Sequence, residues 1–292
     1  MTKLLKLLGL LVLVSIPAAA QDYEIMFNPP LKAGQRYKLT AVNTETTQST
    51  MTAPQRAPKV EKKELGFEWE SVGTILDVDA SGNPTKESHI VVKLNRIKGP
   101  AREVLLSTGA KVVASRENNK SAFEVDGKPA PPELVTVLKE VMSIRYSGIA
   151  ADMFGTKERK KVGDSWSIDE ERTLDVGKKE LVAKNMDVQK VTGKTTLQKV
   201  TKDGDTDVLQ LTGNLTAKIT PPPQDGPTPG EVTMAATMTG AFPVDATNGT
   251  KEENFVRTMN FKMSGKAPQN GAVIQLTGFT KQTSTTKVKF LK

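Results

Sequence analysis

The sequence contains no cysteine and a single histidine, His89, among its 292 residues. Without cysteine the chain can form no disulfide, no thiolate metal site and no lipid-bearing cysteine anchor, and it has no thiol nucleophile. One histidine cannot build a zinc site unless carboxylates supply the other ligands. A serine–histidine–acid triad would have to use His89, but no G-x-S-x-G element accompanies it. We therefore expect His89 to be a surface or hairpin-edge residue, and the sequence predicts no catalytic residue, no metal ligand and no cofactor.

Long apolar runs are also scarce, since 37% of residues are hydrophobic and 5% are aromatic. The one extended run, Leu7–Ile16, is shorter than the roughly 20 residues that span a bilayer. Two lysines precede this run, and Pro17 and three alanines follow it, which completes the pattern of a secretory signal peptide over residues 1–20. We expect cleavage before Gln21 and a mature chain that is periplasmic or extracellular, with no transmembrane segment. An uncleaved N-terminal anchor is the alternative.

The formal net charge is +8, and the basic residues are spread along the chain. Such a distribution is typical of a solvated basic surface. The alternative is attraction to anionic envelope components such as lipid head groups or acidic polysaccharide. Because an exported chain without a basic-aromatic motif is a poor candidate for nucleic-acid binding, no nucleic-acid partner is expected.

Threonine-rich runs with alternating polarity follow the leader, and this alternation predicts β-strands separated by Gly, Asn, Asp and Pro turns. The predicted strands are Arg36–Met51, Leu65–Val78, His89–Ile97, Glu103–Leu106, Lys111–Ser115, Ser121–Val125, Thr195–Thr201, Val208–Ile219, Val232–Phe242, Val256–Ser264 and Val273–Phe290, the last with a possible break. Mixed strand character also covers Leu181–Val191. One amphipathic helix is predicted over Glu133–Ile144, because its apolar residues recur at helical spacing and Pro132 suits the first turn.

The two halves of the chain share an order of motifs. Lys32–Tyr37 and Lys161–Trp166 each contain a lysine, a glycine two positions later and an aromatic residue three positions after that glycine. An Asp/Gly hairpin and a Pro-bearing loop follow in both halves. This order predicts two similar β-units, at 21–147 and 148–292, after the signal peptide. Chance convergence on common hairpin chemistry is the alternative.

The expected fold is mainly β. It is an antiparallel curved sheet or open barrel built from two similar β-units, with the helix at about 133–144 packed on it. Two β-sandwich-like domains that meet near residues 148–160 are the alternative.

The lysine–glycine–aromatic starts and the Thr-rich strands resemble those of uncharacterised bacterial exported β-rich proteins, a domain-of-unknown-function type with a Gly-Asp-Ser-Trp element like Gly163–Trp166. The resemblance covers about half of the mature chain. It implies a β-rich envelope protein and brings no catalytic residues. The architecture is also similar to that of periplasmic lipoprotein carriers with an open-barrel fold.

Two patterns offer alternative chemistry. Asp77–Asn83 resembles the first half of a calcium loop but lacks the bidentate acid at position 12, so a hairpin turn is the preferred interpretation. Paired carboxylates such as Glu68 and Glu70, or Asp169–Glu171, could serve a glycosidase, but no pair is singled out. Glu68 and Glu70 would share one strand face, with Trp69 on the other.

The functional hypothesis is an exported, non-enzymatic, soluble envelope protein that binds an apolar or amphipathic ligand, such as a lipid, or another envelope protein. The sheet's concave side would carry the site. Candidate ligand-binding residues are Phe67, Trp69, Leu138, Met142 and Trp166, each of which could instead pack the core. A carboxylate-based hydrolase acting on envelope glycans and a scaffold or interaction module are the alternatives.

Overall fold

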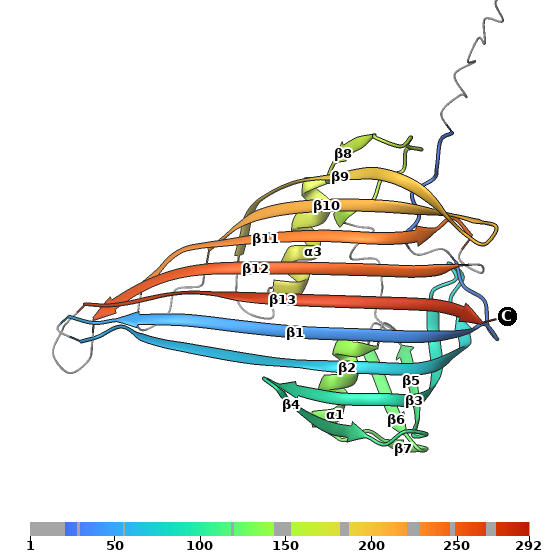
Figure 1. Ribbon diagram of the computed structural model, residues 1–292, viewed down its shortest axis with the longest axis horizontal. Coiled ribbons are helices and arrows are strands. Elements are labelled where there is room, and N and C mark those ends of the chain that lie inside the picture. The colour runs from blue at the N-terminus through green and yellow to red at the C-terminus, as the bar shows by residue number, and fades with distance from the viewer. Residues whose placement is uncertain are drawn as a thin grey trace, which may run out of the picture.

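The computed structural model describes residues 21–27, 30–54, 56–117, 120–142, 153–181, 187–220, 228–245, 249–266 and 273–291. The predicted signal peptide, residues 1–20, lies outside the described residues. The chain forms one antiparallel sheet of 13 strands in the order β7-β6-β5-β3-β2-β1-β13-β12-β11-β10-β9-β8, with β4 paired to β3 beside this path (Figure 1). The sheet is curved and is not closed into a barrel, which confirms the predicted fold class.

The strands of the first half are β1 (Arg36–Thr52), β2 (Lys59–Val78), β3 (Pro84–Lys98), β4 (Ala101–Leu106), β5 (Lys111–Glu117), β6 (Lys120–Val125) and β7 (Lys128–Pro129). Those of the second half are β8 (Ser165–Ser167), β9 (Asp187–Asp203), β10 (Thr206–Thr220), β11 (Thr228–Pro243), β12 (Thr250–Lys266) and β13 (Val273–Leu291). Two helices, α1 (Pro132–Val141) and α3 (Glu170–Leu181), lie behind the sheet in Figure 1. The break predicted within the last strand is wrong, because β13 is continuous.

The pairing of β1 with β13 joins the two halves. Arg36 lies opposite Leu291 and Thr52 lies opposite Gln275, so the first and last long strands pair along the whole of β1. The strands of both halves therefore share one sheet, and the alternative of two separate sandwiches is wrong. Each half contributes its strands in reverse chain order across the sheet.

The two turns that begin the halves are built alike. Gly34 and Gly163 have φ angles of 86° and 92°, which glycine adopts at little cost. Gly34 N–H donates to the Ile75 carbonyl and Gly163 N–H donates to the Leu197 carbonyl, both at 2.8 Å. In each turn the lysine N–H also donates to a side-chain oxygen three residues later, on Gln35 in one and Asp164 in the other. The shared lysine–glycine–aromatic pattern thus corresponds to one local geometry.

Two hydrophobic clusters form the core. The first-half cluster includes Tyr37, Trp69, Leu94 and Leu138, and the second-half cluster includes Phe27, Phe154, Trp166, Leu197 and Met238. Both occupy the side of the sheet that bears the helices. Burial alternates along the strands, because successive side chains point to opposite faces.

Helix α1 begins where the sequence predicts, with a proline in its first turn and Glu133 near the positive end of its dipole. Val137, Leu138 and Val141 form its buried face. The helix ends at Val141, and the predicted extension beyond residue 142 lies outside the described residues.

Helix α3 was not expected from the sequence, which shows no strong apolar stripe there. A local signal for it exists in Asp169, whose carboxylate accepts the Arg172 N–H at 3.0 Å and so caps the helix. Glu170 and Glu171 then occupy the first turn, where negative charge is favourable. Leu174 packs against the second-half cluster.

Candidate ligand-binding face

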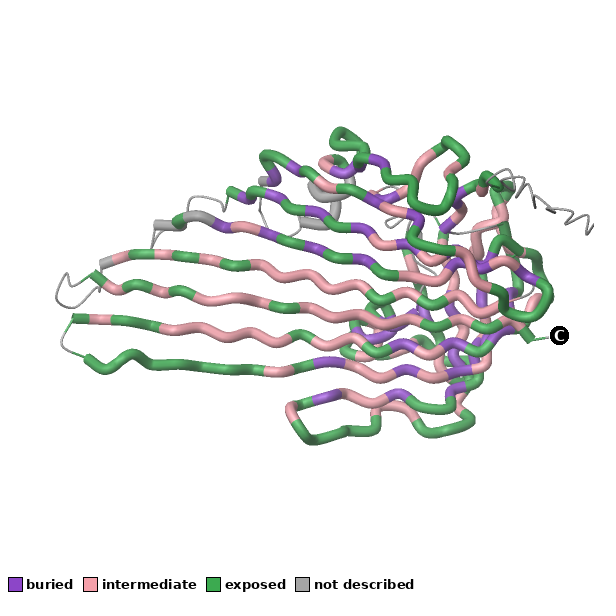
Figure 2. The backbone as a smooth tube through the Cα atoms, turned by 45° about the horizontal axis from the view of Figure 1, so that its top comes forward, coloured by how far each residue is buried: buried purple, intermediate pink, exposed green. Residues whose placement is uncertain are grey.

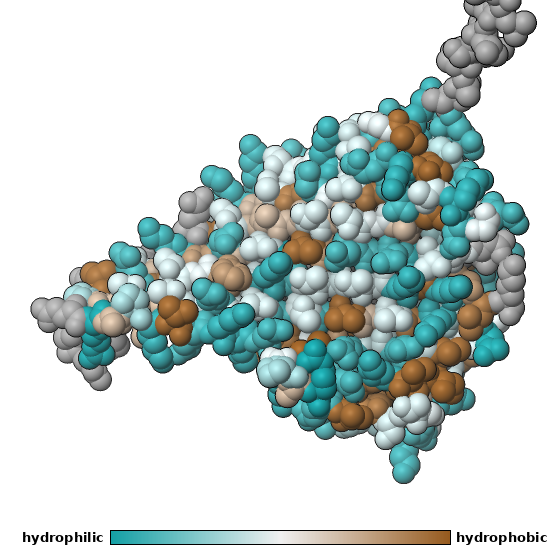
Figure 3. Space-filling model, in the orientation of Figure 1, coloured by the Kyte–Doolittle hydropathy of each residue, from teal (hydrophilic) through white to brown (hydrophobic). Residues whose placement is uncertain are grey.

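The two faces of the sheet differ in polarity. The face away from the helices is covered mostly by polar and charged side chains (Figure 3). The opposite face, which we call the helix-bearing face, is the one toward which the sheet curves (Figure 1). Buried residues concentrate toward one end of this face, while the far ends of β1, β2, β12 and β13 carry half-buried and exposed residues (Figure 2). The far ends are therefore accessible parts of the helix-bearing face.

The five candidate residues do not form one site. Trp69, Leu138 and Met142 are at most 1% exposed in the first-half cluster, and half-buried Phe67 packs against the same cluster. Trp166 lies in the second-half cluster, where its Nε1–H donates to the Phe154 carbonyl at 2.9 Å. Four of the five residues are therefore core residues, which was the alternative role predicted for them. Phe67 is the one of the five that is partly accessible.

Central strand β12 carries a half-buried apolar surface instead. Its residues Met259, Phe261 and Met263 share the helix-bearing face, because Met259 and Phe261 lie opposite the buried residues Met234 and Val232 of β11. Met263 lies opposite Leu276 of β13, and Leu276 lies opposite Met51 of β1. We call this set the apolar lane; its members are Met51, Met259, Phe261, Met263 and Leu276.

Close packing shapes the middle of the lane. A Cβ atom at Gly278 would lie 2.7 Å from Cζ of Phe261, so the phenyl ring lies across β13 at the glycine. Phe261 and Met259 also contact the second-half cluster. The lane is therefore continuous with the core on one side and half-exposed on the other.

A chain of polar contacts crosses the same face beside the lane. Arg257 Nη2 donates to Gln282 Oε1 at 2.5 Å, and Gln282 Nε2 lies 3.5 Å from Asn43 Oδ1. Asn43 Nδ2 lies 3.4 Å from a carboxylate oxygen of Glu140, which belongs to α1. These contacts link β12, β13 and β1 to helix α1. They lie between the two hydrophobic clusters.

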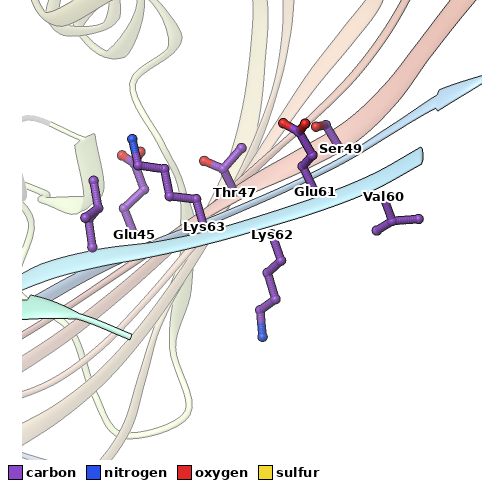
Figure 4. A pocket seen from close by; sticks show the side chains of 8 residues that line it. Glu45, Thr47, Ser49, Val60, Glu61, Lys62 and Lys63 are labelled. Carbon is purple, nitrogen blue, oxygen red and sulfur yellow. The ribbon is translucent and has the colours of Figure 1, made fainter. Parts of the chain in front are cut away.

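An open hollow of about 770 Å³ lies next to the polar contacts, over the C-terminal half of β1 and the N-terminal half of β2 (Figure 4). Its lining residues are Glu45, Thr47, Ser49, Val60, Glu61, Lys62, Lys63 and Leu65. Glu61 and Lys63 point to the same side of the ribbon as Glu45, whereas Val60 and Lys62 point to the other side (Figure 4). Glu45 lies opposite Gln282, so the hollow continues the helix-bearing face next to the polar chain.

The lane and Arg257 were not predicted from the sequence, although the alternation of residues in one stretch indicates them. In the stretch Phe255–Met263 every second residue is Phe, Arg, Met, Phe or Met, which places one arginine on an otherwise apolar strand face. Strand register across β11, β13 and β1 was needed to show which residues complete this surface.

His89 is not a surface residue, contrary to expectation, because it is 1% exposed in the first-half cluster. Its Nδ1 lies 2.9 Å from Ser71 Oγ, and its Nε2 lies 3.3 Å from the Tyr37 hydroxyl and 3.5 Å from Glu87 Oε2. Burial, followed by the nearby Glu87 carboxylate, raises the pKa of Tyr37 well above its usual value. Ser71 is 0% exposed, so this serine–histidine–glutamate contact is a core network to which a substrate has no access.

Strand β2 carries the paired carboxylates as predicted, on the face opposite the buried Trp69. Glu68 lies 3.0 Å from Arg102, and Glu70 lies 2.7 Å from Lys38. These cations hold the carboxylates as surface ion pairs. Asp169 caps α3, as described above.

The Asp77–Asn83 segment forms the hairpin turn between β2 and β3, which was the interpretation preferred over a calcium loop. Asp79 accepts the backbone N–H groups of Asn83 and Ser81, both at 2.9 Å, and the bonds from Asn83, followed by the bond from Ser81, lower the pKa of its carboxyl group. In the described part of the chain, no group of three or more His, Asp or Glu side chains is placed to hold a metal ion.

No family model matches this sequence, and no curated protein matches it. Eight solved chains match, one of them from the structure "Salmonella typhi OmpF complex with Daunomycin". That chain is 10% identical, and the match covers 86% of the present chain and 97% of the other, with a TM-score of 0.17. Similarity at this level carries no argument about function. Among the described helices, none has the length and apolar character needed to cross a membrane.

Proposed function

We propose that this chain is an exported, non-enzymatic envelope protein that binds an amphipathic molecule on the helix-bearing face. The apolar lane is the observation that carries the proposal. Half-buried and exposed methionine, phenylalanine and leucine side chains on adjoining strands offer a continuous surface that a ligand could remove from water. Methionine suits such a surface, because its flexible thioether adapts to ligands of irregular shape.

The adjoining polar residues support an amphipathic rather than a purely apolar ligand. Ligand sites are typically apolar surfaces with a few polar groups that fix orientation. Here the lane supplies the apolar part, and Arg257, Gln282 and Asn43 supply the polar part on the same face. The buried position of Ser71 and the ion pairing of Glu68 and Glu70 favour binding over the hydrolase alternative.

A dye titration with two matched variants tests the proposal. Met263→Gln removes apolar surface from the lane, and Val42→Gln removes it from an exposed position of β1 on the opposite face. With a fluorescent naphthylamine as the probe, Met263→Gln should weaken binding about fivefold, because part of a methionine side chain loses its apolar contact. Val42→Gln should leave the affinity unchanged. No dye binding by the wild type, or equal weakening by both variants, would refute the proposal.

Export and internal repetition belong to the same proposal. The leader pattern supports export, and the identical hydrogen bonding of the turns at Gly34 and Gly163 supports a repeat. N-terminal sequencing of the protein recovered from outside the cytoplasm should begin at Gln21. Recovery of an intact N-terminus beginning at Met1 would contradict cleavage.

A further inference from the structure

Arg257 has an unusual setting for a charged side chain. It lies on the helix-bearing face between Phe255 and Met259, opposite the buried residue Ala236. Its guanidinium has one hydrogen-bond partner within the described residues, the amide oxygen of Gln282, and no ion pair there. Within the part of the chain that the structure describes, this arginine therefore lies on an apolar strand face without a carboxylate in contact.

No described carboxylate of β1, α1 or β12 forms an ion pair with Arg257. Glu45 of β1 lies on the far side of Gln282. The backbones of Glu45 and Arg257 are separated by two inter-strand spacings, or about 10 Å. Glu140 of α1 is bonded to Asn43, and Glu253 of β12 lies 3.6 Å from Lys251. On the adjoining strand β11, the helix-bearing positions beside Arg257 are apolar.

A guanidinium can donate five hydrogen bonds in a planar fork that fits a carboxylate or phosphate in bidentate fashion. A half-buried guanidinium that uses one donor on a neutral amide gains strongly from an added anion, since the anion satisfies its donors and its charge. Gln282 and Asn43 also leave amide groups beside the guanidinium. The polar chain is therefore suited to hold a single negative charge.

The geometry points to a long-chain carboxylate, of the fatty-acid type, whose head group binds Arg257 and whose acyl chain lies along the apolar lane. This inference rests on the proposed function and specifies its ligand class. From Arg257 to Met263 the strand advances about 20 Å, the extended length of an acyl chain of roughly 16 carbons. Met259, Phe261 and Met263 follow Arg257 on the same face, so head and chain sites lie in line.

Competition against the naphthylamine dye tests the inference with two probes that differ only in the head group, hexadecanoate and hexadecanol. The wild type should bind hexadecanoate at least about tenfold more tightly than hexadecanol, because only the carboxylate forms charge-assisted bonds with Arg257. Arg257→Gln should abolish this difference and retain dye and hexadecanol binding. Arg257→Lys should keep part of the preference for hexadecanoate, since lysine retains the positive charge but lacks the planar guanidinium that binds a carboxylate through two hydrogen bonds.

Arg36→Gln is the matched control, because Arg36 is an exposed arginine on the other face of the sheet. This variant should leave the preference for hexadecanoate unchanged. Equal affinity for both probes, or loss of the preference in Arg36→Gln, would overturn the inference while leaving the proposed function intact. Displacement of hexadecanoate by millimolar inorganic phosphate alone would also overturn it, by showing a site for free anions. Failure of the wild type to bind dye, alcohol or carboxylate would refute both proposals.

Discussion

Tyr37 shows how the sheet changes the chemistry of a single residue. Its ring is buried beside His89, and a Cβ at Gly73 would lie 2.6 Å from Tyr37 Cζ and 3.0 Å from His89 Cε1. The glycine therefore leaves the space that the two rings occupy. Burial and the Glu87 carboxylate both disfavour the phenolate, so the pKa of Tyr37 is raised.

The raised pKa predicts a loss of stability in alkaline solution. Below about pH 10 both the folded and the unfolded chain keep the Tyr37 proton. Above that pH the unfolded chain releases it while the folded chain retains it, so the free energy of unfolding falls by up to about 1.4 kcal/mol per pH unit from this residue. Tyr37→Phe should remove this part of the decline, as measured by denaturant unfolding at pH 8 to 11. Parallel pH profiles for the two proteins would contradict the prediction.

At the scale of an element, α1 acts as the cover of the first-half cluster. One face of the helix is buried against the sheet, and Leu138 is 0% exposed on that face. Lys139, the next residue, is exposed. The helix also reaches the candidate site, because Glu140 contacts Asn43 of β1. Its packing therefore affects both the stability of the fold and the position of the polar chain.

Shortening Leu138 should destabilise the protein substantially. Leu138→Ala removes buried methyl groups and leaves a cavity, so the free energy of unfolding should fall by about 2–5 kcal/mol. Lys139→Ala, which alters the solvent face of the same helix, should change it by less than about 0.5 kcal/mol. Urea titrations followed by circular dichroism would measure both. A change below about 1 kcal/mol for Leu138→Ala would show that α1 does not cover the cluster as described.

At the scale of the whole molecule, one sheet carries two hydrophobic clusters. The β1–β13 pairing connects them through strands whose central residues on the helix-bearing face are mostly polar. The coupling between the halves thus combines an extended backbone hydrogen-bond ladder with apolar contacts, including that of Phe290 of β13 with the first-half cluster and that of Phe27 with the second-half cluster. Two tryptophans, one in each cluster, allow this coupling to be measured.

Both clusters should unfold in one transition, because the ladder extends over all of β1. In Trp69→Phe the remaining fluorescence reports the second-half cluster through Trp166, and in Trp166→Phe it reports the first-half cluster through Trp69. Within each variant the fluorescence and circular dichroism curves should coincide in a urea titration. Separate midpoints would show that the halves unfold independently.

Alternating polarity determined most of the strands and the β class from the sequence alone. The run Arg36–Met51 corresponds to β1 within one residue, and the apolar stripe of Glu133–Ile144 corresponds to α1 over its described length. The Asp77–Asn83 turn was predicted as a hairpin for the same local reason, since short polar side chains bond to neighbouring N–H groups. Such features depend on residues close together in the chain.

Tertiary structure decided the features that depend on strands distant in sequence. Pairing of β1 with β13 brings Met51 next to Leu276 and Glu45 next to Gln282, which no local pattern specifies. The pairing of β1 with β2 and of β2 with β3 placed His89, Ser71 and Tyr37 inside one cluster, whereas the pairing of β8 with β9 placed Trp166 in the other cluster. The sequence determined which side chains share a strand face, because side chains alternate with a period of two. Only the order and register of the sheet determined which faces adjoin, and therefore where an amphipathic ligand could bind.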